Sequence, residues 1–227
     1  MTREFAIVPA VDVLDGRAVR LLQGDYDRIE VEAGDPLALV RRAASFAPPF
    51  VHVVALGAAR DGGAPLELAR AAVEAAAPVP VQLGGGVRSV ADAIAVVAAG
   101  VGRVVVGTAF HLLEELSDAL GERLAVSIDI ADGIARTQGW RESSGLTIVQ
   151  ALERCASVST VVCTAIARDG TRSGPDLDLL HKARSAYTGR LLAAGGIRNG
   201  DDVDAVRELG LDGVVVGRAW LDGTLEL

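Results

Sequence analysis

Cysteine and histidine are scarce in this sequence, and their scarcity excludes two kinds of site. Among 227 residues there are only two cysteines, Cys155 and Cys163, too few for a disulfide framework and without CxxC spacing. The three histidines, His52, His111 and His181, are scattered, with no pair at metal-ligand spacing. We therefore expect no metal, and we expect His52, inside a predicted strand, to be a core residue.

Basic charge and long apolar runs are also lacking. Lys and Arg number 22 against 30 Asp and Glu, and the net charge of −8 argues against a nucleic-acid partner, because a phosphate backbone demands clustered positive charge. The N-terminal apolar run is too short for a signal peptide, and no run approaches a membrane span. We expect a reduced cytoplasmic protein that contacts neither nucleic acid nor membrane. A monomer is the default expectation, because the sequence itself does not disclose an oligomeric state.

What the sequence does contain is a regular alternation of β-branched runs with amphipathic segments rich in Ala and Leu. Runs such as GRVVVG (102–107) are apolar throughout, as parallel strands buried on both faces are. Strands are predicted at 5–12, 50–56, 79–83, 103–106, 124–129, 159–163, 190–194 and 213–216. Helices are predicted at 35–46, 64–76, 89–99, 110–119, 145–155, 176–186 and 200–209, with N-caps at Ser89, Asp176 and Asn199. The pattern predicts an α/β fold, a single (β/α)8 TIM barrel domain over residues 1–227.

An internal repeat divides that barrel into halves. Residues 81–110 align without a gap on the residues from Leu192 onward. The aligned pairs, each 110 residues apart, are Gly85 and Gly195, Gly86 and Gly196, Arg88 and Arg198, Gly100 and Gly210, and Gly107 and Gly217. Chance reuse of glycine-rich loops is the weaker explanation for so many gapless pairs.

A second repeated motif lies earlier in each half. VDVLDG (11–16) matches IDIADG (128–133), which pairs Asp12 with Asp129 at a separation of 117 residues. The difference of seven residues between the two separations predicts a longer loop in the first half. Two (βα)4 halves would then form a barrel with pseudo-twofold symmetry.

Glycine-rich turns between strands and helices predict two phosphate sites. GGGVR (84–88), VVGTA (105–109), AGGIR (194–198) and VVGRA (215–219) each follow a strand and precede a helix. Glycine lets the backbone approach a ligand, and the helix start offers unpaired N–H groups. Any one glycine pair alone fits a tight turn equally well, and Arg88 and Arg198 fit solvated first-turn residues equally well. The expected phosphate-binding residues are Gly85, Gly86, Gly107, Thr108, Gly195, Gly196, Gly217 and Arg218.

Aspartates end two opposite strands at the face where barrel chemistry occurs. Asp12 ends strand 1 and Asp129 ends strand 5, so they face each other across the mouth. Two such carboxylates can serve as general acid and general base if their environments separate their pKa values. Asp169 and Gly170 form a turn after strand 6, which ends at Thr164, and add a third candidate.

One aromatic residue could cover a bound ligand. Trp140 lies in the predicted loop 130–144, which is long enough to close over a barrel mouth. The alternative, that Trp140 only packs against its own loop, fits the sequence equally well.

Taken together, these residues resemble the phosphoribosylformimino-aminoimidazole carboxamide ribotide isomerase of histidine biosynthesis. The resemblance covers nearly the whole chain. Its most specific pieces are PAVDVLDGRAVRLLQGDY (9–26), LGGGVR (83–88), VGTA (106–109), the SID…GW run (127–140), DGTRSGP (169–175), AAGGI (193–197) and VGRA (216–219). The resemblance implies a pseudo-twofold barrel, a small-molecule substrate with two phosphorylated ends, and no cofactor.

The resemblance also implies a reaction and roles. The reaction is an Amadori rearrangement, which converts an aminoaldose to an aminoketose. An acid protonates the ribose ring oxygen, and a base removes the C2 proton from the resulting iminium. By motif match Asp12 is the base and Asp129 the acid, with Asp169 in contention as acid. Thr164 matches a position that assists the chemistry, and Arg20 one that contacts substrate.

Alternatives remain at this point. The sister cyclase of the pathway begins with a Cys-Leu-Asp strand that is absent here. The run RTQGW (136–140) resembles a loop of bifunctional relatives that also isomerise phosphoribosylanthranilate. Ala55 stands where the family usually has Asp, and the chain ends at Leu227, so that we expect the eighth helix to be short or absent. These departures keep open a phosphate-binding barrel with impaired catalysis.

Overall fold

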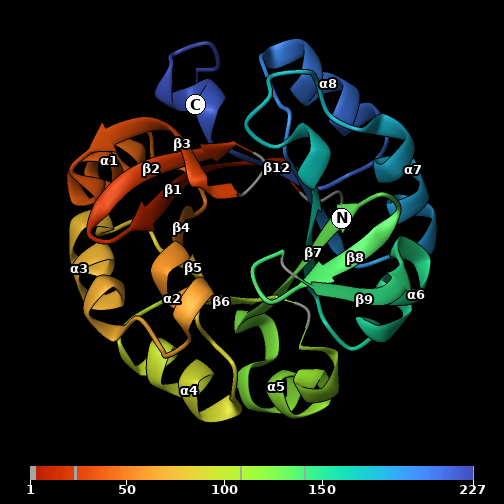
Figure 1. Ribbon diagram of the computed structural model, residues 1–227, viewed down its shortest axis with the longest axis horizontal. Helices are drawn as coiled ribbons and strands as arrows, with labels where there is room; N and C mark the ends of the chain where they lie inside the picture. Colours follow the sequence, from red (N-terminus) through yellow and green to blue (C-terminus); the bar gives the residue numbers. More distant parts are fainter. Residues whose placement is uncertain (1–3, 23–24, 108, 141, 227) are drawn as a thin grey trace.

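The computed structural model describes residues 4–22, 25–107, 109–140 and 142–226, and its centre is a closed barrel of parallel strands (Figure 1). The barrel strands, in spatial order, are β1 (Ala6–Leu14), β4 (Val51–Ala55), β5 (Val81–Gly84), β6 (Arg103–Val106), β7 (Leu124–Ala131), β10 (Thr160–Ala165), β11 (Arg190–Ala194) and β12 (Gly213–Val216). The first and last strands pair in parallel, from Ala6 opposite Gly213 to Pro9 opposite Val216, and this pairing closes the barrel. The predicted TIM barrel is confirmed.

Helices surround the barrel on its outside (Figure 1). They are α1 (Pro36–Ala44), α3 (Leu66–Ala76), α4 (Val90–Ala98), α5 (Leu113–Leu120), α6 (Ile148–Arg154), α7 (Leu177–Ala186) and α8 (Gly200–Glu208). The side chains of Ser89, Asp176 and Asn199 accept hydrogen bonds from the first helical turn, as the sequence predicts of N-caps. None of the described helices has both the length and the apolar character needed to cross a membrane.

The chain after β12 forms only a short helix. α9 (Arg218–Leu221) has four residues, as expected of a short eighth helix. Trp220 within it is 2% exposed, and its Nε1 donates to the carbonyl oxygen of Ala10 at 3.1 Å. This one aromatic side chain therefore covers the seam where the first and last strands meet.

Two antiparallel hairpins stand at corresponding places in the halves. β2 (Arg17–Leu22) and β3 (Asp25–Gly34) follow β1, and β8 (Ile134–Thr137) and β9 (Glu142–Thr147) follow β7. The sequence predicts a long loop over 130–144, and the structure corrects this, because most of the segment forms the hairpin of β8 and β9. Short, largely polar strands give no hydrophobic run, and they form here because β8 pairs with the end of β7 and β9 pairs with β8. The longer first hairpin accounts for most of the seven extra residues of the first half, with strands of six and ten residues against four and six.

A further element covers the first half of the mouth. The short helix α2 (Leu56–Asp61) begins where β4 ends, a stretch for which the sequence predicts no helix. None of its six side chains is fully buried, so the sequence of this segment has no amphipathic periodicity that would predict a helix.

The apolar core forms two layers. The larger layer lies between the strands and the outer helices, and a smaller cluster fills the inside of the barrel. The inner cluster consists of Ala6, Val8, Ala10, Val162, Leu192 and Val215. Because side chains alternate along each strand, one set of residues packs outward while the next faces the barrel axis. The axis is therefore filled below and free only at the carboxyl ends of the strands.

Candidate active site

A cavity of about 730 Å³ opens at the carboxyl ends of the barrel strands. It is lined from both halves of the chain, and it brings together every predicted site residue that the structure describes. These are Asp12, Arg20, Gly85, Gly86, Gly107, Asp129, Trp140, Thr164, Asp169, Gly170, Gly195, Gly196, Gly217 and Arg218. Thr108, also predicted, lies outside the described residues.

Asp12 is held by an arginine from the first hairpin. Nη1 of Arg20 lies 2.5 Å from Oδ2 of Asp12, and Nη2 donates to the carbonyl oxygen of Ala10 at 2.8 Å. The two side chains are only 11% and 19% exposed. Arg20 also packs against Gly217, where an added Cβ would overlap its guanidinium group. Arg20 therefore links the first aspartate to the turn after the last strand.

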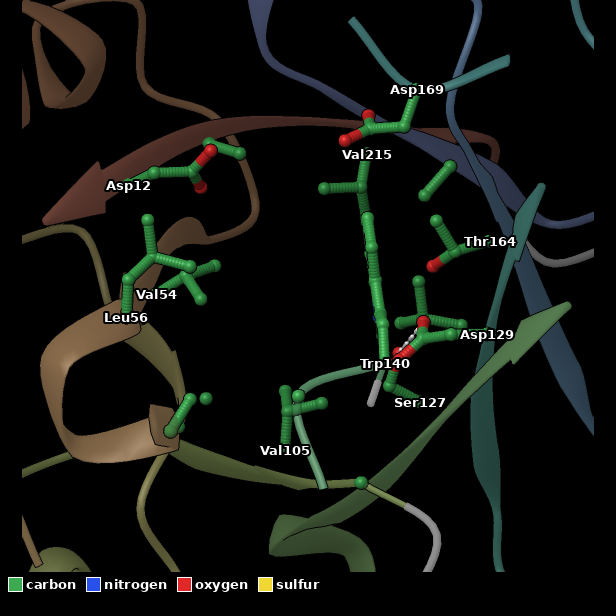
Figure 2. Close-up of a pocket in the computed structure, with 18 of the residues that line it drawn as sticks. Asp12, Val54, Leu56, Val105, Ser127, Asp129, Trp140, Thr164, Asp169 and Val215 are labelled. Atoms are coloured by element: carbon green, nitrogen blue, oxygen red, sulfur yellow. Dashed lines mark hydrogen bonds between the residues drawn. The ribbon is translucent and has the colours of Figure 1, made fainter. Parts of the chain in front are cut away.

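Asp129 faces this pair from the opposite side. Its Oδ1 accepts a hydrogen bond from Ser127 at 2.7 Å, and it lies in register with Thr164 on the neighbouring strand. Burial raises the pKa of Asp129, and hydrogen bonds from Ser127, Thr164 and Trp140 oppose part of that rise. In Figure 2 Trp140 projects into the space between Asp12 and Asp129.

Asp169, in the loop after β10, lines the same cavity as Asp12 and Asp129. Burial raises its pKa to about 6, the negative charge of Asp12 adds to the rise, the positive charge of Arg20 opposes it, and Asp129 adds further. A carboxyl group with this pKa is part protonated near neutrality, which suits a general acid. Figure 2 shows its oxygens directed toward the cavity.

The glycine turns repeat their geometry in the two halves. Gly85 and Gly195 have φ of 101° and 88°, and an added Cβ would overlap the carbonyl oxygens of Ala55 and Ala165 respectively. Only glycine can adopt this backbone and this approach together. The turns therefore fold back onto the preceding strand ends and bring backbone close to the cavity.

The arginines beside these turns differ in their partners. Arg198 is bound by Asp202 through contacts of 2.8 and 2.7 Å and does not line the cavity. Arg88 lines it while donating to the carbonyl oxygen of Ala59 at 3.3 Å. Arg218 also lines it and donates to the carbonyl oxygen of Gly170 at 2.8 Å. Of the three, Arg218 is the one tied to the loop that carries Asp169.

The sequence reasoning missed several lining residues, among them Tyr26, His111, Ser127 and Arg172. Ser127 could have been found, because it stands two residues before Asp129 on one strand and so faces the same side. His52 was expected to be a core residue, and it is buried with Nδ1 3.2 Å from Nε2 of Gln82. It also lines the cavity, and burial lowers its pKa to about 4, so it is neutral near pH 7.

The two halves of the mouth share a backbone arrangement but differ in their side chains, since polar residues of the second half correspond to apolar residues of the first. At the separation of 110 residues, Thr164 corresponds to Val54 and Asp169 to Ala59. Figure 2 places Val54 and Leu56 on the side of Asp12, away from the polar group around Asp129. Ala55 is 4% exposed and does not line the cavity, whereas Val54 and Leu56 do. The residue at position 55 therefore lies beside the mouth rather than in it.

Three carboxyl groups, those of Asp12, Asp129 and Asp169, line this cavity. Among the described residues, no three His, Cys, Asp or Glu side chains are grouped so that they could hold a metal ion. Carboxyl groups at three points around one bound molecule can donate and remove protons on different atoms of it.

Comparison with known proteins gives one consistent result. A family model described as histidine biosynthesis protein matches residues 6–226. Curated relatives named 1-(5-phosphoribosyl)-5-((5-phosphoribosylamino)methylideneamino) imidazole-4-carboxamide isomerase include one from Gloeobacter violaceus, 39% identical over 97% of this chain and 90% of that one. Another, from Deinococcus radiodurans, is 38% identical over 96% and 94%, and one from Chloroflexus aggregans is 36% identical over 97% and 94%. The chain thus belongs to the histidine biosynthesis protein family.

Proposed function

We propose that this protein is the isomerase of histidine biosynthesis that rearranges the formimino-aminoimidazole carboxamide ribotide from aminoaldose to aminoketose. The observation that carries the proposal is the cavity itself. Asp12 faces Asp129 and Asp169 across it, and a pair of glycine turns lies in each half of the chain. A ligand with a phosphate at each end would bridge the two pairs of turns and set its reacting sugar between the carboxyl groups. The names of the relatives support the same reaction.

The proposed chemistry needs one acid and one base. An acid protonates the ring oxygen as the C1–O bond breaks, which leaves an iminium at C1. Asp12 then removes the C2 proton, and the electron pair of that bond forms the enolamine, which tautomerises to the aminoketose. Asp129 and Asp169 both carry raised pKa values and both line the cavity, so that either can serve as the acid. Arg20 orients Asp12 through their ion pair.

The experiment that tests the proposal is turnover by the full chain on two substrates. We expect conversion of the formimino ribotide and none of phosphoribosylanthranilate. Conversion of both would establish the bifunctional alternative, whereas tight product binding without conversion would establish the phosphate-binding barrel. Complementation of strains that lack the histidine or the tryptophan isomerase gives the same distinction in cells.

Asp12→Asn provides the residue-level arm of this experiment. It keeps the size of the side chain and removes the base, so we expect a loss of kcat on the order of a thousandfold with affinity nearly intact. Asp15→Asn is the matched control, because Asp15 is 72% exposed in the adjoining turn. Activity of Asp12→Asn within about tenfold of the parent would refute Asp12 as the base.

A further inference from the structure

One carboxylate outside the proposed mechanism joins two arginines of the cavity rim. Oδ2 of Asp222, just after α9, contacts Nη2 of Arg172 and lies 3.5 Å from Nε of Arg218. Arg172 belongs to the loop after β10, and Arg218 to the turn after β12. Both arginines line the cavity. Asp222 therefore connects two separate loops at the mouth.

These loops do not follow neighbouring strands. β11 stands between β10 and β12, so the loop after β10 must cross the end of β11 to reach the turn at Gly217. It does so over the glycine turn of that strand. An added Cβ at Gly195 would approach Ala165 and the backbone nitrogen of Asp169, and one at Gly196 would overlap Gly174. The crossing loop thus forms a roof over the glycine turns of the second half.

The crossing loop has an unusual backbone conformation and is contacted by side chains from outside the loop. Arg172 has φ of 53°, in the left-handed region that side-chain-bearing residues rarely adopt. Its side chain is anchored by the ion pair with Asp222. Arg218 holds the same loop from the other side through the carbonyl oxygen of Gly170, the residue next to Asp169.

The ion pairs of Asp222 are partly exposed, which indicates that they position the loop rather than stabilise the whole fold. The side chains of Arg172, Asp222 and Arg218 are 38%, 36% and 29% exposed. Ion pairs this accessible to water contribute little to the free energy of unfolding. What they can determine is where a short loop lies.

We propose that Asp222 is a positioning residue that fastens the loop after β10 to the phosphate turn and thereby places Asp169 for proton transfer. This inference rests on the proposed function, because it assumes that Asp169 takes part in the reaction. Occupation of the turn at Gly217 and Arg218 by a phosphate of the ligand is then coupled to the position of Asp169.

Two substitutions at Asp222 test the proposal. Asp222→Asn keeps the shape and removes the charge, and Asp222→Glu keeps the charge. In the Asn variant we expect kcat to fall on the order of tenfold, with KM for the ribotide unchanged within about twofold, because both arginines remain available to phosphate. The Glu variant should recover most of the loss. Unchanged kcat in the Asn variant would overturn the proposal.

A pH profile separates positioning from damage to the fold. Asp169 is surrounded by Asp12, Arg20 and Asp129, and burial together with these charges sets its pKa near 6. If the loop loosens, Asp169 gains solvent and its pKa falls toward the ordinary range, so the high-pH limb of kcat should move to lower pH in the Asn variant alone. A loss of kcat that is uniform across pH would overturn the proposal. Asp204→Asn, which removes an exposed pair with Arg207 on α8, is the matched control and should keep the parent profile.

A readout independent of turnover distinguishes this inference from the proposed function. Trypsin cuts after arginine, and the crossing loop contains Arg168 and Arg172. Inorganic phosphate should slow cleavage there in the parent and in Asp222→Glu, but not in Asp222→Asn. If the parent does not turn over the ribotide yet shows this pattern, the proposed function fails while the fastening of the loop stands. If turnover is present and the Asn variant is protected like the parent, the positioning role fails.

Discussion

Each of the three candidate carboxyl groups has a different environment at the scale of single residues. Asp12 is paired with a guanidinium group, Asp129 accepts from the hydroxyl of Ser127, and Asp169 lies among the charges of the other two. Identical side chains can divide the roles of acid and base only when their surroundings separate their proton affinities. Burial raises the pKa values of Asp129 and of Asp169 within the cavity that they share with the ion-paired Asp12.

The raised pKa of Asp169 predicts a cost to stability. Its folded-state pKa is about 6 against an ordinary value of 3.8, so the unfolded chain ionises first as pH rises. Its contribution is neutral well below pH 4, and stability is lost as the pH rises from about 4 to about 6, above which the loss is complete. Asp169→Asn should therefore raise the free energy of unfolding at pH 8 by about 3 kcal/mol, with little gain at pH 4.

Urea unfolding at the two pH values measures this difference. Asp15→Asn, at an exposed position near the same mouth, is the control and should change little at either pH. A gain that is equal at pH 4 and pH 8 would show that the buried charge is not its cause.

At the scale of elements, the two halves repeat a strand, a hairpin and a pair of glycine turns. Periodicity was enough to predict the barrel strands and outer helices, because these elements bury a continuous face. The hairpins and α2 were missed. β8 and β9 are short and carry no hydrophobic run, β2 and β3 are ordered by pairing with β1 and with each other, and the residues of α2 bury none of their side chains fully. Within the repeat, Gly85 and Gly195 approach the preceding strand in the same way.

Alanine substitutions separate backbone conformation from close approach. Gly85→Ala meets both a positive φ of 101° and overlap with the carbonyl oxygen of Ala55, so we expect a loss of about 2–4 kcal/mol. Gly133→Ala meets a φ of 76° with nothing within 4 Å, so we expect about 1 kcal/mol. Gly195→Ala should behave like Gly85→Ala. Equal losses at Gly85 and Gly133, measured by urea unfolding, would contradict the close approach.

At the scale of the whole molecule, the barrel depends on closure between its first and last strands. The parallel pairing of β1 with β12 supplies the backbone hydrogen bonds, and Trp220 covers the seam. The carbonyl oxygen of Ala10 accepts from both Trp220 and Arg20. Closure and the placement of Asp12 are therefore connected through one residue of β1.

Trp220→Ala should be among the most damaging substitutions. It removes a side chain that is 2% exposed, and we expect a loss of about 3–5 kcal/mol in the free energy of unfolding. Trp220→Phe should lose less, because most of the ring volume remains. Trp140→Ala, at the other tryptophan of the chain, should change stability by less than about 1 kcal/mol while it lowers activity. Comparable losses at Trp220 and Trp140 would contradict the role of Trp220 at the seam.

The sequence by itself determined the barrel, its two halves and many of the residues at its mouth, whereas lining residues such as Ser127 and Arg172 were missed. Alternation of strands and helices sets the fold, and glycines repeated 110 residues apart mark the turns that line the cavity. Only the tertiary structure decided which groups meet there. The pairing of Arg20 with Asp12, the bridge from Asp222 to Arg172 and the raised pKa of Asp169 all depend on groups distant in the chain and on their exclusion from water. The local sequence pattern determines which face of a strand or helix a side chain occupies. The charges around that side chain and its burial depend on the closure of the whole barrel.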